Sequence, residues 1–122
     1  MVFKYWGEYM KKINILKKTQ DFNRIINNNN NKPFKYKDYI IYIEKKESGF
    51  YNFGLSVGKK IGNAVTRNKY KRRLKNIIDE KSYENSFNCI IIVGKGILNR
   101  SFEEMRSNLF EAFDKLNIIK EK

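Results

Sequence analysis

The chain has 122 residues, the size of one domain, and its 41% hydrophobic and 15% aromatic content is enough to bury a core. It holds 26 lysines and arginines against 13 acidic residues, a net charge of +13. This excess points to nucleic acid as the leading partner, and no apolar run is long enough to span a membrane.

The chain has no histidine and one cysteine, Cys89, so it offers neither a Ser-His-Asp triad, nor a zinc site, nor an internal disulfide. Cys89 lies in the apolar run "FNCIIIVG", which is typical of a buried small hydrophobe rather than a nucleophile. A lone thiol fits the reducing cytoplasm. We therefore expect no catalytic residue and no metal ligand among the protein's side chains.

The N-terminus shows no secretory signal pattern, and Met10 offers an alternative start. We expect residues 1–12 to be an extension and residues 13–120 to form the domain. "TQDFNRII" (19–26) predicts a short helix, since Phe22, Ile25 and Ile26 share one face. Five asparagines follow at 27–31 and predict a loop with no role of its own.

Two strands are expected next. In "DYIIYIEKK" (38–46), Tyr39, Ile41 and Ile43 alternate with Ile40 and Tyr42. "FYNFGLSVG" (50–58) has a bulky face, and its other face, with Gly54 and Ser56, is almost bare. That bare face could be a close-packed edge, or it could let a polymer backbone lie against the sheet.

The basic segment "KKIGNAVTRNKYKRRLKN" (59–76) follows the second strand and predicts a helix from Asn63, its N-cap, to about Lys81. "FNCIIIVG" then predicts a central strand, and "SFEE" a capping box that opens a final amphipathic helix. The order is α-β-β-α-β-α, with a small extra strand near "PFKY". We expect a single-domain α/β (α+β) two-layer sandwich.

No acidic residue occurs between Ser48 and Ile78, so this stretch contains no carboxylate to neutralise the eight basic residues of positions 59–76. Arginine forks such as those of Arg67 and Arg72 suit bidentate phosphate contacts, and the glycines around Lys59 and Lys60 let backbone amides approach a phosphate. This combination favours RNA, although composition alone does not exclude DNA.

The stretch "FGLSVGKKIGNAVTRNKYKRRLKN" resembles the signature of the bacterial ribonuclease P protein family. "LKKTQDF", "IIYI", "CIIIVGKG" and "SFEEMRSNL" extend the likeness over residues 13 to 120. The resemblance implies a fold related to a ribosomal small-subunit protein domain, with a left-handed crossover between parallel strands. Such a crossover departs from the usual right-handed rule.

The resemblance also implies the function. Members bind a large catalytic RNA, and the holoenzyme, an endoribonuclease, removes the 5′ leader of precursor tRNA. The RNA performs this hydrolysis with Mg²⁺, so the metal is bound mainly by the RNA, and the partners are that RNA and precursor tRNA. Neither a membrane nor a protein partner is implied.

The family's RNA-binding motif maps onto Lys59, Lys60, Asn63, Arg67, Asn68, Lys69, Lys71, Arg72 and Lys75. Its leader-binding cleft, between the first helix and the sheet, maps onto Phe22, Ile26 and Tyr42. The chain departs from the family pattern at four positions: Ile26 replaces a common phenylalanine, Gly58 a serine, Lys69 an arginine and Arg73 an apolar residue. The alternatives are a ribosomal-type RNA-binding protein and a DNA-binding module.

Overall fold

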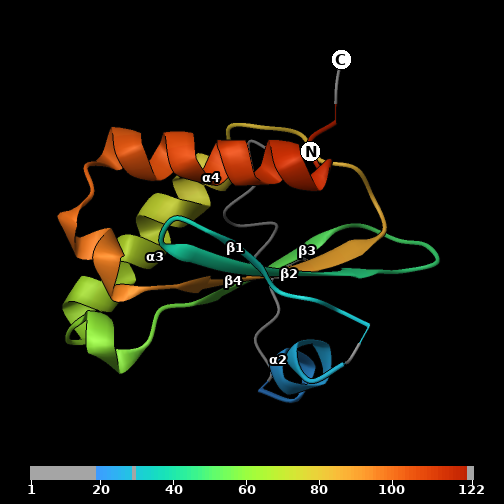
Figure 1. Cartoon of the computed structure of the whole chain (residues 1–122), viewed down its shortest axis with the longest axis horizontal. Helices are drawn as coiled ribbons and strands as arrows, with labels where there is room; N and C mark the ends of the chain where they lie inside the picture. Colours follow the sequence, from blue (N-terminus) through green and yellow to red (C-terminus); the bar gives the residue numbers. More distant parts are fainter. Residues whose placement is uncertain (1–18, 29, 121–122) are drawn as a thin grey trace.

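The computed structural model describes residues 19–28 and 30–120, which form one four-stranded sheet with helices on both faces (Figure 1). The strand order is β1-β2-β4-β3; β3 runs parallel to β4 and the other pairs are antiparallel. The elements are α2 (Thr19–Ile26), β1 (Phe34–Tyr36), β2 (Tyr39–Lys45), β3 (Asn52–Ser56), the 3-10 turn η1 (Lys59–Ile61), α3 (Ala64–Ile78), β4 (Phe87–Val93), the 3-10 turn η2 (Lys95–Asn99) and α4 (Phe102–Leu116). This confirms the expected α/β order, with β1 as the small extra strand and β4 as the central one.

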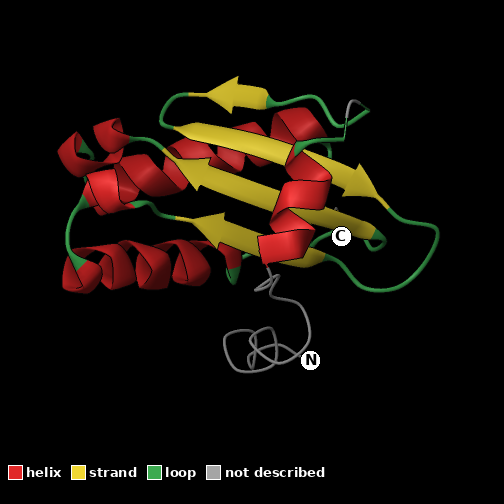
Figure 2. Ribbon diagram, turned by 90° about the horizontal axis from the view of Figure 1, so that it is seen from below, coloured by secondary structure: helices red, strands yellow, loops and turns green. Residues whose placement is uncertain are grey.

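The two faces of the sheet are covered by different helices. Helices α3 and α4 lie over one face, whereas α2 lies across the other (Figures 1 and 2). The parallel strands β3 and β4 are joined through α3, where the resemblance implies a left-handed crossover; the handedness stays a prediction. The expected extension at residues 1–12 lies outside the described residues.

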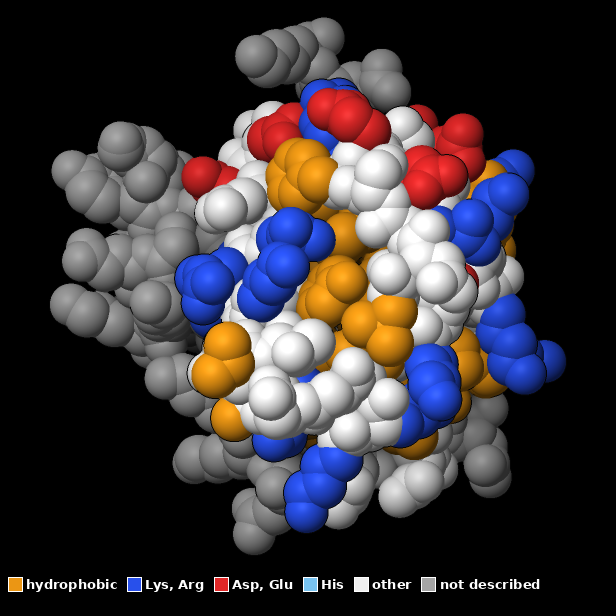
Figure 3. Space-filling model, turned by 90° about the vertical axis from the view of Figure 1, so that its left-hand side faces the viewer, with side chains coloured by type: hydrophobic (Ala, Val, Ile, Leu, Met, Phe, Trp, Pro, Cys, Tyr) orange, Lys and Arg blue, Asp and Glu red, His pale blue; other side chains and the backbone are white. Residues whose placement is uncertain are grey.

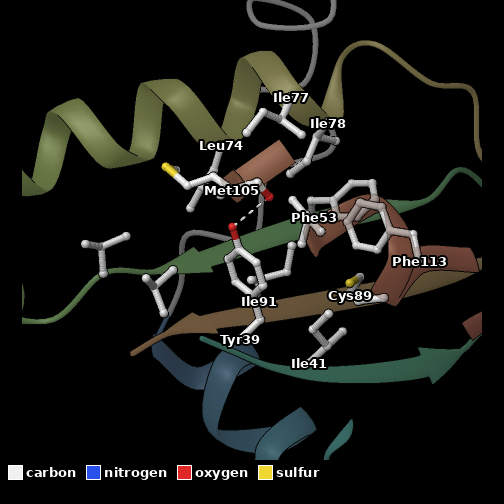
Figure 4. Packing of buried hydrophobic residues seen from close by; sticks show 14 of the residues in the cluster. Tyr39, Ile41, Phe53, Leu74, Ile77, Ile78, Cys89, Ile91, Met105 and Phe113 are labelled. Carbon is white, nitrogen blue, oxygen red and sulfur yellow. Dashed lines mark hydrogen bonds between the residues drawn. The ribbon is translucent and has the colours of Figure 1, made fainter. Parts of the chain in front are cut away.

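The main core fills the space between the sheet and the α3–α4 layer (Figure 4). The alternate side chains that share this face of the sheet, such as Tyr39 and Ile41 of β2 and Phe53 of β3, point into the core and are fully buried. The Tyr39 hydroxyl donates a hydrogen bond to the backbone carbonyl of Met105 at 3.1 Å, which ties β2 to α4. Ile25 of α2 and Ile90 of β4 are also fully buried but do not belong to this cluster, since they lie on the other face.

Helix α3 begins as the sequence predicts, because the Asn63 side chain accepts a hydrogen bond from the backbone N–H of Thr66 at 3.0 Å. The turn η1 lies between β3 and this helix, and Gly62 links η1 to the N-cap of the helix with φ +155°. A Cβ at Gly62 would lie 3.0 Å from the Thr66 side chain, so the link requires glycine.

The expected end of this helix near Lys81 is wrong by three residues, since α3 ends at Ile78. The buried Tyr83 hydroxyl donates to the Ile78 carbonyl at 2.6 Å, which takes up a helix-end acceptor and turns the chain back into the core. The capping box at Ser101 and Glu104 is confirmed at the start of α4.

Cys89 is fully buried in β4, and this burial raises the pKa of its thiol well above the ordinary value. The thiol therefore stays protonated, as the interpretation of a structural cysteine requires. No helix among residues 19–28 and 30–120 is long and apolar enough to cross a membrane.

Candidate RNA-binding surface

Helix α3 carries six basic residues and no acidic residue between Ala64 and Ile78. Its buried side chains, Tyr70, Leu74, Ile77 and Ile78, form one stripe against the core. The basic residues lie outside the stripe: Lys69 and Arg72 are exposed, and the others are half-buried. The structure thus gives the helix one apolar side and one cationic side.

Arg67 has a property that the sequence did not reveal. Its guanidinium Nε is buried, yet it has no hydrogen-bond partner among the described residues. A buried donor without a partner costs about 1–3 kcal/mol, so such groups need an explanation. A phosphate oxygen of a bound RNA is an acceptor of the kind this donor lacks, and the side chain has to turn outward before the phosphate can reach the buried Nε.

Arg73, where the family commonly has an apolar residue, lies over the ring of Tyr70, with 5.5 Å between the guanidinium carbon and the ring centroid. Tyr70 is one turn earlier and mostly buried. Arg73 therefore covers part of the core edge with its planar group and keeps its charge in solvent.

The segment before the helix adds Lys59 and Lys60, which are exposed on η1. Ile61, in the same turn, is buried and anchors them. Asn63 follows as the N-cap and uses its carboxamide oxygen there, which leaves its amide nitrogen as a donor for an RNA contact.

The predicted leader-binding residues lie on the opposite side of the sheet from α3. Phe22 and Ile26 are half-buried on α2, which packs on β2, and Tyr42 is half-buried on β2. Tyr42 pairs with Ile90, which in turn pairs with Gly54 of β3. The tyrosine, the isoleucine and the glycine therefore form one row across this face, with Gly54 itself buried. The leader cleft stays a prediction.

A second row, made of polar side chains, crosses the same face two residues further along β2 from Tyr42. Arg24 of α2 pairs with the Glu44 carboxylate. The Asn88 amide nitrogen donates to Glu44 at 2.9 Å, and the Asn52 amide nitrogen donates to the Asn88 oxygen at 2.8 Å. This row links α2 to three strands and fixes the helix over the sheet. Sequence reasoning missed it, although an asparagine inside the apolar run of β4 was a signal.

The asparagine run does have a structural role, contrary to expectation. The Asn31 amide nitrogen donates to the backbone carbonyl of Ile25 at 3.1 Å, near the end of α2. The Asn28 side chain accepts from the backbone N–H of Asn30 at 2.9 Å. These bonds satisfy a helix-end carbonyl and shape the loop after the helix.

Acidic side chains gather on a different element. Four carboxylates are exposed on α4: Glu103, Glu104, Glu111 and Asp114. No group of three Cys, Asp or Glu side chains within the described ranges is placed to hold a metal ion. The cationic surface of η1 and α3 is thus the strongest candidate site, and its chemistry is anion binding.

Comparison with known proteins agrees with this geometry. Residues 10–117 match the family model described as ribonuclease P. The chain belongs to the ribonuclease P protein family. It is 35% identical to the ribonuclease P protein component of Mesoplasma florum over 82% of this chain and 92% of that protein. It is 33% identical to that of Halalkalibacterium halodurans over 93% and 96%.

Solved structures of the ribonuclease P family share the fold. The ribonuclease P protein of Staphylococcus aureus superposes with a TM-score of 0.77 at 25% identity, covering 87% of this chain and 97% of that one. The ribonuclease P protein of Thermotoga maritima superposes with a TM-score of 0.72, covering 82% and 94%. The family and fold expected from the central motif are therefore confirmed.

Proposed function

We propose that this ribonuclease P protein binds the catalytic RNA of the holoenzyme through η1 and α3 and assists removal of the 5′ leader from precursor tRNA. The observation that carries the proposal is the acid-free cationic side of α3, which includes the buried and unpartnered Nε of Arg67. Repulsion among neighbouring basic side chains destabilises a helix, and binding to a polyanion offsets this repulsion.

In this proposal the RNA performs the chemistry and holds Mg²⁺, and the protein binds and orients. The chain has no histidine to act as a general base, and its one thiol is buried and protonated. Both facts support a binding role for the protein side chains. We place its action in the cytoplasm, a compartment that a single reduced thiol suits.

We propose further that the single-stranded leader lies on the α2 face of the sheet, between Phe22 and Ile26 of the helix and Tyr42 of β2. The half-buried aromatic rings of Phe22 and Tyr42 support this placement of the leader, because a ring with one free face can stack on an unpaired base. Such a stack contributes about 1–3 kcal/mol per base. Ile26 offers packing without stacking, so we assign the stacking to the two aromatic residues.

The deciding experiment is cleavage of precursor tRNA by a bacterial ribonuclease P RNA at low Mg²⁺, with and without the protein. Cleavage that depends on added protein is the expected result. If the protein binds that RNA tightly but gives no stimulation, the proposal is refuted. A ribosomal-type RNA-binding role would then be the better account of the basic surface.

A further inference from the structure

The polar row on the face of the sheet that α2 covers is one continuous chain of contacts from β3 to the helix. Asn52 donates to Asn88, and Asn88 donates to Oε1 of Glu44. The other carboxylate oxygen of Glu44, Oε2, pairs with Arg24 of α2. One oxygen of the carboxylate is therefore held by the sheet and the other holds the helix, so Glu44 is the joint between the two.

Asn88 and Glu44 are costly residues for the places they occupy. Asn88 is 5% exposed in a strand whose other side chains are apolar. The Glu44 side chain is mostly buried, whereas that of Arg24 is half exposed. Apolar residues of similar size would avoid the cost of taking an amide and a carboxylate out of water. What the polar chain adds to apolar packing is direction, because a hydrogen bond is strong in one orientation only.

The charge of Glu44 also runs against its surroundings. Seen from the left-hand end of Figure 1, acidic side chains gather toward the upper margin, where α4 lies, and basic side chains occupy the area below them (Figure 3). Glu44 lies on the face opposite α4, where we place the leader. A carboxylate beside a polyanion lowers affinity unless a cation neutralises it, and Arg24 does so here. The pair therefore calls for a structural reason.

Helix α2 depends on such contacts for its position on the sheet (Figure 2). It has eight residues, fewer than an isolated helix needs to be stable in water. Ile25 is its fully buried anchor. One apolar anchor fixes how far the helix lies from the sheet, but it leaves the helix able to rotate about its own axis. A directional contact on the flank of the helix removes that freedom.

The spacing of residues around α2 shows what the ion pair controls. At about 100° per residue, Ile25 lies between Arg24 on one flank and Phe22 on the other. Arg24 reaches Glu44, and Tyr42 lies two residues from Glu44 on the same face of β2. Rotation of the helix about its anchor would therefore change the distance between the rings of Phe22 and Tyr42. The ion pair holds that distance at one value.

We propose that Glu44, held by Asn88 and paired with Arg24, is a positioning residue that sets the spacing of Phe22 and Tyr42 for stacking on bases of the leader. This inference rests on the proposed function. In this role Glu44 acts through α2 and does not contact the RNA. Loss of the ion pair should therefore cost affinity only for an RNA that carries a leader.

The test breaks the ion pair from each side, in the full-length protein assembled with ribonuclease P RNA. Glu44→Gln raises the net charge from +13 to +14, and Arg24→Gln lowers it to +12. The matched controls are Glu80→Gln and Arg106→Gln, which break the 2.7 Å ion pair of the α3–α4 layer on the other side of the sheet. Thermal melts establish that the variants fold. Dissociation constants are then measured for precursor tRNA and for mature tRNA, which has no leader.

Both variants of the Arg24–Glu44 pair should bind precursor tRNA at least about fivefold more weakly than the wild-type holoenzyme, the lower end of the effect of one lost base stack. Both should bind mature tRNA as before, and both controls should behave as the wild type. In cleavage assays the KM for precursor tRNA should rise with kcat unchanged, because the pair affects binding and not the reacting bond.

The two variants change the charge in opposite directions, so a charge effect would move their affinities in opposite directions. That result overturns the inference, as does equal weakening for precursor and mature tRNA. If Glu44→Gln does not fold, Arg24→Gln against Arg106→Gln makes the same comparison at equal net charge. If the wild-type protein adds no preference for precursor over mature tRNA to that of the RNA alone, it is the proposed leader cleft that fails.

Discussion

Replacing Lys71, Arg72 and Lys75 of α3 with glutamine should flatten the salt dependence of RNA binding. Each lost phosphate contact removes about 0.7–0.9 from the log-log slope, so three contacts remove about 2.1–2.7. Between 50 and 200 mM salt, this corresponds to a roughly 20–40-fold smaller loss of affinity for the variant than for the wild-type protein. Glutamine preserves the aliphatic stems and is a good helix former, so the fold should remain intact.

The matched control replaces Lys45, Lys115 and Lys120, exposed lysines outside α3, with glutamine. Both triple variants change the net charge from +13 to +10. They therefore differ only in where the charge is lost. The affinity for ribonuclease P RNA is measured by filter binding at four or more salt concentrations. Equal slopes for the two triple variants would refute the assignment of α3 as the RNA footprint, since the whole-molecule charge would then account for binding.

Three other perturbations test the opposite face and the core. Phe22→Ala with Tyr42→Ala should weaken the binding of precursor tRNA to the holoenzyme by about 1–3 kcal/mol per lost stack and leave mature tRNA unaffected; equal losses for both would remove the leader assignment. Arg24→Ala should cost about 0.2–1 kcal/mol of folding stability, as the loss of a partly exposed ion pair does. Glu44→Ala should cost about 1–3 kcal/mol, because it also removes an acceptor of the Asn88 amide. If urea unfolding shows the larger loss of stability for Arg24→Ala, the role assigned to this row of polar side chains is wrong. Burial raises the pKa of Cys89, so on raising the pH the unfolded state loses the thiol proton before the folded state does. The folding stability should therefore fall as the pH rises above about 8.5, by up to about 1.4 kcal/mol per pH unit. The Cys89→Ala variant should show a shallower decline of stability over the same pH range.

The local features of the fold were predictable because they depend on residues three or four positions apart. Asn63 caps α3 through Thr66, and Ser101 with Glu104 forms the capping box of α4. The pattern of apolar residues likewise identified β2, and the near-continuous apolar run identified β4. The expected end of α3 differs from the observed one because a contact from outside the helix decides it: the buried Tyr83 hydroxyl reaches back to Ile78 from the following loop.

The polar row on the α2 face could not be predicted in the same way. Arg24 and Glu44 are 20 positions apart, and Asn52 and Asn88 are 36 apart. Their contact depends on β4 lying between β2 and β3, an order that no local pattern states. The burial of the Arg67 Nε is also a property that only the folded chain shows.

The sequence by itself determined the charge, the family and the elements, since composition, spacing and capping are written in neighbouring residues. The tertiary structure alone decided which side chains share a surface. It brought Asp38 to Arg100 across 62 positions, and it placed the turn η2 beside η1. The physical reason is that strand order and helix placement follow from burial of apolar surface between distant segments, which no short stretch of sequence encodes.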